Sequence, residues 1–347
     1  MTKFSKVKTL AAIAGACATL FVSTSANAYV YAVSRLEIAN LAISVKDSLG
    51  NPLNTASTYQ FNVTDSASFT VGGTTFSQGD TRSCGGNITN GTTTCNPFGP
   101  EVLGTAVANA PGSSPMRANN DFSFLGTGPL TNYSSADSQI LTAELVQGIP
   151  TTSKQISESL LNGSLQAAAS TTLNSNTTLT MVLTILQGGT SLFLSFDADM
   201  DQMSQINDIS ATETSASTTG NVNFSLAKNN SGGKKITWAP NGTGNGCNND
   251  LVAGTCAITF DQENLQAQTG TSLNPSTDQN ATFNTASDFS KFGLNIVGLD
   301  AGTYTIVLAG STGTLVSRVP EPGSIALLGI ALAGLGLSTR RRAAKQA

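Results

Sequence analysis

Apolar and polar residues alternate along several short segments of the chain. In each segment every second residue is apolar, and Gly, Asn, Pro or Thr separate the segments at short intervals. Such alternation is typical of half-buried β-strands, because one face of an extended segment lies in a core and the other in solvent. The pattern predicts a mainly β protein with a β-sandwich or jelly-roll-like body. The clearest segments are Tyr59/Phe61/Val63, Leu179/Met181/Leu183/Ile185, Val222/Phe224/Leu226, Ile236/Trp238 and Tyr304/Ile306/Leu308.

One segment favours a short helix instead. Thr152 and Gln155 stand at the spacing of a capping box, in which two side chains bond the first backbone N–H groups of a helix. Ile156 and Leu160 follow among polar residues, four positions apart. We therefore expect one short helix over 152–169.

The segment from Leu299 to Thr305 predicts a turn into a final strand. Gly302 supplies the backbone freedom that a turn needs, and the residues after it have high strand propensity. It resembles the closing strand of many bacterial surface β-sandwiches. We therefore expect a single β-rich body over residues 29–318.

The N-terminal residues have the pattern of a secretory signal peptide. A lysine-rich start precedes the apolar stretch Leu10–Val22, and Ala26 and Ala28 give the small-x-small pattern that signal peptidase reads. The 13 residues of the apolar stretch are too few to cross a hydrocarbon layer of roughly 30 Å as a helix. The sequence therefore predicts export, with residues 1–28 removed by signal peptidase.

The last 29 residues combine a proline-rich segment, an apolar run and a basic end. As a helix, the apolar run would span about 26 Å at roughly 1.5 Å per residue, which is close to a thin bilayer. Arginines beyond the run favour a cytoplasmic tail, which leaves the body outside the inner membrane. The three parts are Val319-Pro320-Glu321-Pro322, Gly323–Thr339 and Arg340-Arg341-Arg342.

This three-part C-terminus, residues 319–347, resembles the PEP-CTERM sorting signal of Gram-negative bacteria, which an exosortase reads. The resemblance implies transient insertion in the inner membrane and cleavage near Glu321 by a cysteine-dependent, transpeptidase-like membrane enzyme. It also implies release or attachment at the cell surface or in the extracellular matrix, and an association with exopolysaccharide and biofilm production. Glu321 is then part of a substrate rather than a catalytic residue. A plain C-terminal membrane anchor is the alternative.

Composition narrows the chemistry of the body. The chain has no histidine, which excludes Ser-His-Asp and Cys-His nucleophiles and imidazole metal sites. The formal net charge is −4, but residues 29–318 hold 10 basic and 20 acidic side chains, because basic residues gather in the two ends. An acidic body argues against nucleic acid as a partner, which would favour a clustered basic surface.

The cysteines fit an oxidising compartment. Signal-peptide cleavage would remove Cys17 and leave an even number. Cys84 and Cys95 enclose ten residues, and Cys247 and Cys256 enclose eight, so we expect each pair to staple a hairpin-like loop. Local pairing is one of three connectivities that four cysteines allow. A metal or redox site is the alternative, although no CxxC motif is present.

Three aspartates alternate directly after an apolar segment: Asp197, Asp199 and Asp201. Carboxylates in this pattern can converge on a hard cation, and Asp208 at position twelve echoes an EF-hand calcium loop. The glycine and the bidentate glutamate of that loop are missing. If the segment is a strand instead, the three carboxylates face solvent on one side. Calcium is therefore a hypothesis, and we expect no other cofactor.

The sequence favours a structural or adhesive role in the exopolysaccharide layer, exerted through an extended polar surface rather than an enzyme active site. A carbohydrate-binding module is the alternative, with Trp238 or an exposed tyrosine stacking on sugars. A carboxylate-dependent glycoside hydrolase is less favoured. Carboxylates outside the aspartate cluster are scattered singly, and no spacing indicates a catalytic pair.

Overall fold

The computed structural model of the chain describes residues 29–53, 56–87, 92–93, 101–107, 120–127, 132–144, 149–162, 168–207, 211–251, 254–273, 279–283 and 289–320. Its regular elements in these ranges are β-strands. No helix within the described ranges is long and apolar enough to span a membrane. The strands are β1 (Tyr29–Lys46), β2 (Ala56–Val71), β3 (Thr74–Asn87), β4 (Thr92–Thr93), β5 (Glu101–Val107), β6 (Tyr133–Glu144), β7 (Ile149–Asn162), β8 (Ala169–Ile185), β9 (Thr190–Asn207), β10 (Ala211–Lys228), β11 (Lys235–Trp238), β12 (Cys247–Asn249), β13 (Thr255–Asp261), β14 (Gln266–Leu273), β15 (Gln279–Phe283), β16 (Ser290–Leu299) and β17 (Gly302–Pro320).

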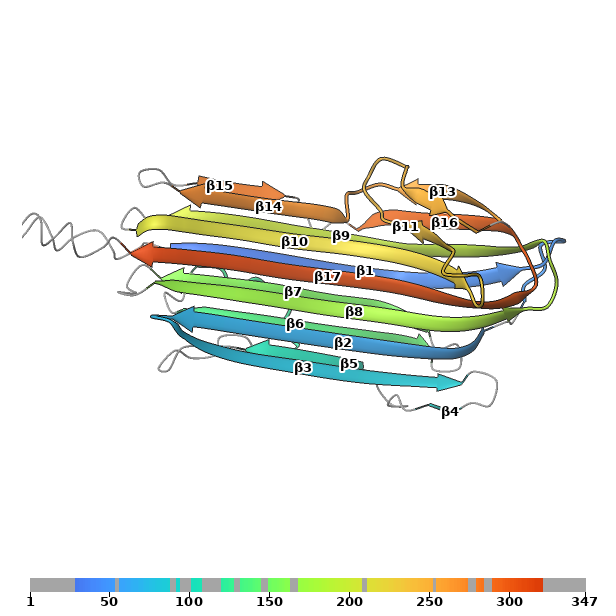
Figure 1. The fold of residues 1–347 in the computed structure, drawn as a ribbon, viewed down its shortest axis with the longest axis horizontal. Coiled ribbons are helices and arrows are strands. Elements are labelled where there is room, and N and C mark those ends of the chain that lie inside the picture. The colour runs from blue at the N-terminus through green and yellow to red at the C-terminus, as the bar shows by residue number, and fades with distance from the viewer. Residues whose placement is uncertain are drawn as a thin grey trace, which may run out of the picture.

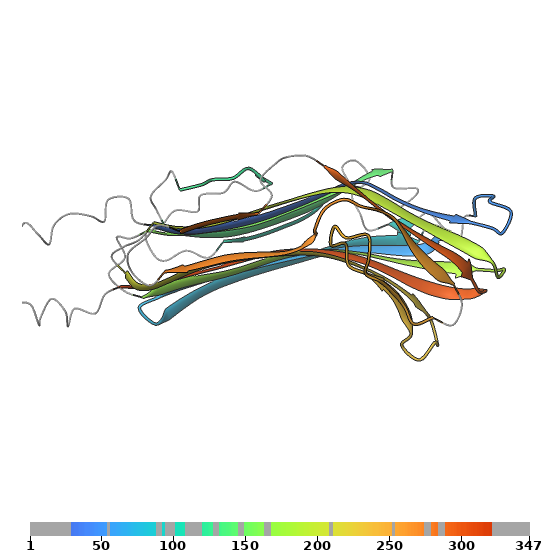
Figure 2. The ribbon, with the colours of Figure 1, turned by 90° about the horizontal axis from the view of Figure 1, so that it is seen from above.

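The strands form two antiparallel sheets that pack face to face (Figure 1, Figure 2). Sheet A has eight strands in the order β13-β16-β9-β1-β7-β6-β5, with β15 beside β9. Sheet B has nine strands in the order β12-β11-β10-β17-β8-β2-β3-β4, with β14 beside β10. The chain crosses between the sheets repeatedly. The last of the described strands, β17, lies at the centre of sheet B, between β10 and β8. The predicted mainly β body is confirmed.

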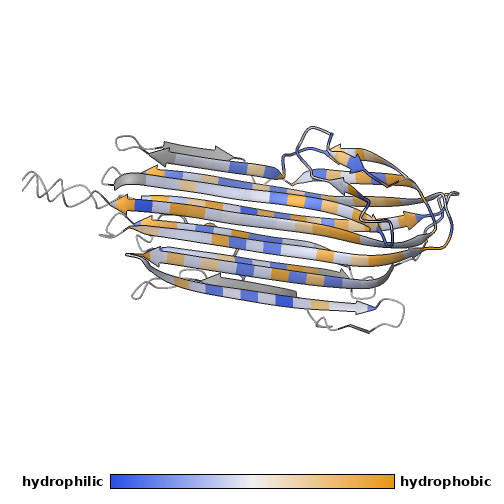
Figure 3. Ribbon diagram, in the orientation of Figure 1, coloured by the Kyte–Doolittle hydropathy of each residue, from blue (hydrophilic) through white to orange (hydrophobic). Residues whose placement is uncertain are grey.

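The five alternating segments lie in strands, as their pattern predicts. They fall in β2, β8, β10, β11 and β17. In β8, for example, Leu179 and Met181 are buried between the sheets, whereas Thr178 and Thr180 are partly exposed on the other face. Figure 3 shows the resulting alternation of apolar and hydrophilic residues along the long strands.

The helix predicted over 152–169 is wrong for the described residues of that range. Residues Ile149–Asn162 form β7, which pairs with β1 and β6 in the middle of sheet A. Ile156 and Leu160 are four positions apart, a spacing that places two side chains on one face of a helix and also on one face of a strand. The local pattern fits both structures, so pairing with two neighbouring strands decides the outcome.

The space between the sheets is apolar at both ends and polar in the middle. The larger apolar cluster includes Phe196 and Trp238, and the smaller one, at the other end, includes Val30 and Val316. Between them lies a set of buried polar residues that we call the polar belt. It comprises Ser34, Asp65, Ser138, Gln155, Ser157, Ser159, Ser175, Thr177, Gln202, Thr218, Thr312 and Thr314.

Hydrogen bonds across the polar belt join the two sheets. The hydroxyls of Ser159 and Thr314 are 2.9 Å apart, and Gln155 Nε2 donates to Thr177 Oγ1 over 3.0 Å. Gly310 makes room for the Gln155 amide, because a Cβ on this glycine would lie 2.5 Å from Gln155 Nε2. Since each such bond contributes about 1 kcal/mol net, the belt chiefly fixes how the sheets align.

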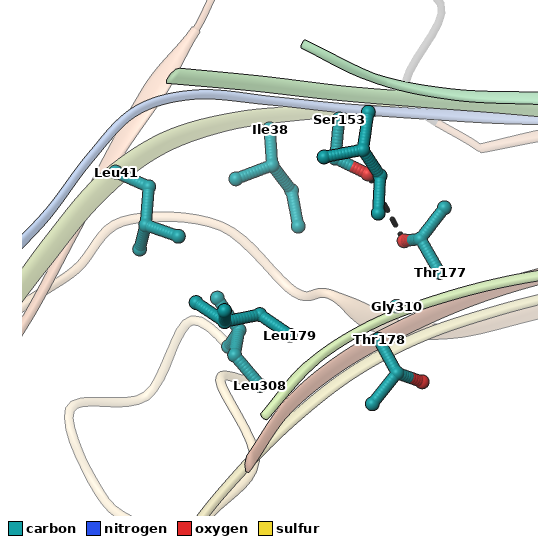
Figure 4. A pocket seen from close by; sticks show the side chains of 9 residues that line it. Ile38, Leu41, Ser153, Thr177, Thr178, Leu179, Leu308 and Gly310 are labelled. Carbon is teal, nitrogen blue, oxygen red and sulfur yellow. Dashed lines mark hydrogen bonds between the residues drawn. The ribbon is translucent and has the colours of Figure 1, made fainter. Parts of the chain in front are cut away.

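A small cavity marks the boundary between the belt and the larger apolar cluster (Figure 4). Its volume is about 20 Å³, and Ile38 and Leu41 of sheet A face Leu179 across it. Ser153 Oγ donates to Thr177 Oγ1 over 3.0 Å at its wall. A space of this size admits about one water molecule. The cavity is therefore a gap in packing rather than a ligand site.

Both ends of the described body lie at one end of the sandwich. In Figure 1, β1 begins at the end to which the arrow of β17 points. Val30 near the start of β1 and Val316 near the end of β17 belong to the same smaller apolar cluster. We call this the terminal end of the sandwich, because the segments that precede Tyr29 and follow Pro320 attach there.

Candidate functional site

The outer face of the four central strands of sheet B is broad and uncharged. It consists of every second residue over 58–70 of β2, 170–184 of β8, 303–317 of β17 and 215–227 of β10. None of these positions carries a charged residue, and most are Ser, Thr, Asn or Gln. The alternation that buries one face of each strand places these hydroxyl and amide groups on the other. We call this surface the polar face.

Strand register arranges the polar face in rows. One central row runs Thr64, Asn176, Ser311 and Asn221 across β2, β8, β17 and β10. Neighbouring strands lie about 4.8 Å apart, and alternate residues along a strand about 6.7 Å apart. The groups therefore form a grid whose spacing is set by the backbone, which is preorganised for contact with another extended, hydrogen-bonding surface.

A hollow interrupts the polar face between β10, β11 and β17. Its open volume is about 360 Å³, and Asn223, Ser225 and Thr237 line it together with the apolar Val307. Lys235 brings one positive charge to its wall. The hollow brings together several polar groups that could orient a small ligand.

Trp238 borders the hollow, but its side chain is buried in the core. It is 1% exposed, and its ring centroid is 6.0 Å from that of Phe196. It therefore offers no ring to a sugar at the surface, and the same holds for the tyrosines that are at most 5% exposed. These are Tyr31, Tyr59, Tyr133 and Tyr304.

The three aspartates singled out by sequence lie along β9, not in an EF-hand-like loop. They share the outer face of sheet A, and the residues between them pack inward. Asn40 Nδ2 donates to Asp197 over 2.7 Å. Arg35 Nε donates to Asp201 over 2.9 Å, and a terminal nitrogen of Arg35 is 3.7 Å from Asp199. Arg35 thus supplies positive charge to this cluster.

Burial shapes the protonation of the cluster. It raises the pKa of Asp199 to about 7, with the charge of Asp201 adding to the rise and Arg35 opposing it. Burial also raises the pKa of Asp201, again against Arg35. The Phe124 ring covers the guanidinium, 4.6 Å from its central carbon. Within the described residues, no three Cys, Asp or Glu side chains gather as a metal site. Asp208, the twelfth position of the calcium-loop hypothesis, lies outside the described residues.

A carboxylate that sequence reasoning missed fastens residues 120–127 to the outer face of sheet A. Glu158 Oε1 accepts bonds from the Tyr31 and Tyr133 hydroxyls, at 2.5 and 3.3 Å. It also accepts from the backbone N–H groups of Leu125 and Gly126, at 3.0 and 2.9 Å. These hydrogen bonds give Glu158 a structural role. Its partners come from distant parts of the chain, so no local sequence motif predicts the site.

The predicted Cys247–Cys256 disulfide is present. Its Cα atoms are 6.3 Å apart, and it joins β12 of sheet B to β13 of sheet A, so it staples the edges of the two sheets. Cys84 is also disulfide-bonded. Its predicted partner, Cys95, lies outside the described residues.

The predicted sorting segment begins within sheet B. Val319 and Pro320 are the last residues of β17 and still pair with β10. The other predicted processing and targeting residues lie outside the described part of the chain. They are Ala26, Ala28, Glu321, Pro322, Arg340, Arg341 and Arg342.

Comparison with known proteins supports the sorting segment alone. No curated protein matches the chain. The structure of infectious bursal disease virus Gx strain aligns at 11% identity over 90% of this chain and 89% of that chain, but its TM-score of 0.08 carries no argument. A family model for the PEP-CTERM protein-sorting motif matches residues 318–342, which hold the Pro-Glu-Pro segment, the apolar run and the arginines. The chain therefore carries a PEP-CTERM sorting signal.

Proposed function

We propose that this protein is an exosortase-processed component of the cell surface or extracellular matrix, and that its role is structural or adhesive rather than enzymatic. The sorting motif implies export, membrane anchoring before processing, and an exosortase as partner. The polar face carries the proposal for the body. It is an ordered array of hydroxyl and amide groups across four strands, and it carries no charged side chain.

The chemistry of the polar face suits an exopolysaccharide. Sugar hydroxyls donate and accept hydrogen bonds, as do the Ser, Thr, Asn and Gln side chains of the face. Single bonds contribute only about 1 kcal/mol each, but many sites on one polymer act together through high effective concentration. The acidic body, with 20 acidic against 10 basic side chains over 29–318, disfavours polyanions such as nucleic acid.

A carbohydrate-binding module with one defined subsite is the second candidate. The hollow beside Asn223 and Thr237 favours it, because polar side chains and the apolar Val307 line one hollow. We do not propose a hydrolase: Asp199 and Asp201 are buried against Arg35, and Asp65, which lies opposite Asp80 in the strand register, is buried between the sheets.

Binding of the purified protein to exopolysaccharide from the producing cells tests the proposal. In the test variant Thr64→Ala/Asn176→Ala, two exposed neighbours of the central row lose their hydrogen-bonding groups. Loss of two bonds worth about 1 kcal/mol each predicts binding about 30-fold weaker at a single contact. The matched control Ser44→Ala/Ser195→Ala removes two exposed hydroxyls from sheet A and should bind as the native protein does.

Two other outcomes separate the candidates. Equal loss in the test and control variants, or no loss in either, would refute a role of the polar face. If Asn223→Ala/Thr237→Ala abolishes binding while Thr64→Ala/Asn176→Ala does not, the hollow is the subsite and the second candidate holds.

A further inference from the structure

The hollow between β10, β11 and β17 differs from the neighbouring polar face in its charge. Lys235 and Thr237 stand at alternate positions of β11, on the side away from the buried Trp238 side chain. In the strand register Thr237 lies opposite Ser225 of β10, and both line the hollow together with Lys235. Lys235 is the one charged residue among the described residues that line it. The hollow therefore places a single positive charge beside hydroxyl groups, next to a face that carries no charged side chain.

One wall of the hollow comes from the loop between β11 and β12, residues 239–246, and this loop is fastened to the opposite sheet. Asp261 of β13 in sheet A accepts a hydrogen bond from the backbone N–H of Gly242 over 3.0 Å. Gly246, which lines the hollow, directly precedes the Cys247–Cys256 disulfide. The wall is thus held by a hydrogen bond and by a covalent bond. A wall that is already ordered lowers the entropy cost of binding a ligand.

A sugar unit that carries a carboxylate matches these groups. Its hydroxyls exchange hydrogen bonds with the serine, threonine and asparagine side chains of the hollow, and its carboxylate pairs with the lysine ammonium group. The open volume of about 360 Å³ lies in the range of small-molecule sites. The body as a whole is acidic, with 20 acidic against 10 basic side chains over 29–318, and therefore repels a polymer in which every unit is charged. The matching polymer combines neutral units with acidic ones.

We propose that the hollow binds an acidic sugar unit of the exopolysaccharide, with Lys235 pairing with its carboxylate. The inference rests on the second candidate function, the carbohydrate-binding module, and names the class of its ligand. The uncharged polar face beside the hollow then contacts neutral units of the same polymer. In this arrangement the hollow sets the position at which the polymer lies on the protein, because only an acidic unit satisfies the charge of Lys235.

Short fragments of the exopolysaccharide, untreated and carboxyl-reduced, test the pairing by calorimetry at low salt. Reduction converts each carboxylate to a primary alcohol and leaves the sugar backbone intact. We expect the unmodified protein to bind reduced fragments about fivefold more weakly than untreated ones, because an exposed ion pair contributes up to about 1 kcal/mol. Lys235→Gln should bind untreated fragments about fivefold more weakly than the unmodified protein does. It should bind reduced fragments as the unmodified protein does, because the lysine then has no carboxylate to pair with.

Two further variants serve as controls. Lys234→Gln removes the same charge one position earlier, from a lysine that precedes β11 and is not among the residues that line the hollow. It should bind both kinds of fragment as the unmodified protein does. Lys235→Arg keeps the positive charge and should retain most of the affinity for untreated fragments. Retention in this variant shows that the loss in Lys235→Gln comes from the charge rather than from a change in the fold.

The outcomes separate this inference from the proposed function. Equal binding of untreated and reduced fragments to the unmodified protein overturns the acidic ligand and leaves polysaccharide binding in place. A loss in Lys235→Gln that is the same for both kinds of fragment overturns it as well, because the lysine then acts without the carboxylate. Equal losses in Lys234→Gln and Lys235→Gln overturn the assignment to the hollow. If neither kind of fragment binds the unmodified protein, the proposed function fails together with the inference.

Discussion

Asp65 of the polar belt should make the fold less stable as the pH rises. Its side chain is 1% exposed between the sheets, where Ser138 donates to one carboxylate oxygen and the other has no partner. Burial raises its pKa from 3.8 to about 6, and the Ser138 and Ser175 hydroxyls near the carboxylate oppose this rise. The ionised form is thus disfavoured in the folded protein relative to the unfolded chain.

The sign and size follow from this shift. Between pH 3.8 and about 6 the folded state binds more protons than the unfolded state, so stability falls as the pH rises through this window. This rise of the pKa from 3.8 to about 6 corresponds to about 3 kcal/mol of lost stability, reached above pH 6. Asp65→Asn removes the charge at nearly constant volume. It should raise the free energy of unfolding by up to about 3 kcal/mol at pH 7.5 and change it little near pH 4.

Guanidinium unfolding of the oxidised protein at both pH values measures the difference. Asp250→Asn, which alters an exposed loop carboxylate, is the control and should show no such pH-dependent gain. The reasoning fails if Asp65→Asn destabilises the protein at pH 7.5, or if its effect is the same at pH 4 and pH 7.5. Either result would mean that the belt holds the carboxylate charged at little cost.

Two further predictions concern contacts between the sheets. Gly310→Ala would place a Cβ 2.5 Å from Gln155 Nε2 and 3.0 Å from Leu36 Cδ2, and should lower the free energy of unfolding by about 1–3 kcal/mol in denaturant titrations. An unchanged midpoint would show that the Gln155 amide moves freely. Cys247→Ser opens the disulfide between β12 and β13, and should cost about 2–3 kcal/mol in the same assay under oxidising conditions, with no difference once the native protein is reduced.

The strands were predictable where burial on one face leaves a period of two. Tyr304, Ile306 and Leu308 alternate with partly exposed residues, and β17 begins at Gly302, where φ is +151°. β7 was not predictable in this way, because it is buried on both faces. Ile156 and Leu160 contact the 120–127 region while Ser157 and Ser159 enter the belt, so polar residues are as buried as apolar ones. Without an exposed face, β7 lacks the period-two alternation that identifies a strand, so the sequence pattern fits a helix as well.

The candidate sites also differ in whether the sequence alone predicts them. The sorting motif is contiguous, and sequence alone indicates it. The polar face is a property of register: Thr64 and Asn221 are far apart in the chain and share a row only because β8 and β17 lie between them. The belt adds to the difficulty, since β8 carries Thr and Ser on both faces and only the opposite sheet distinguishes buried Thr177 from exposed Asn176.

The two apolar clusters differ in the size of their side chains, which gives the two ends of the sandwich unequal stability. The larger cluster holds Phe196, stacked on Phe292 with centroids 5.1 Å apart, whereas the smaller cluster at the terminal end contains many alanines. Larger side chains bury more apolar area and contribute more stabilisation. Local opening is therefore favoured at the terminal end, while the belt and the larger cluster keep the sheets aligned.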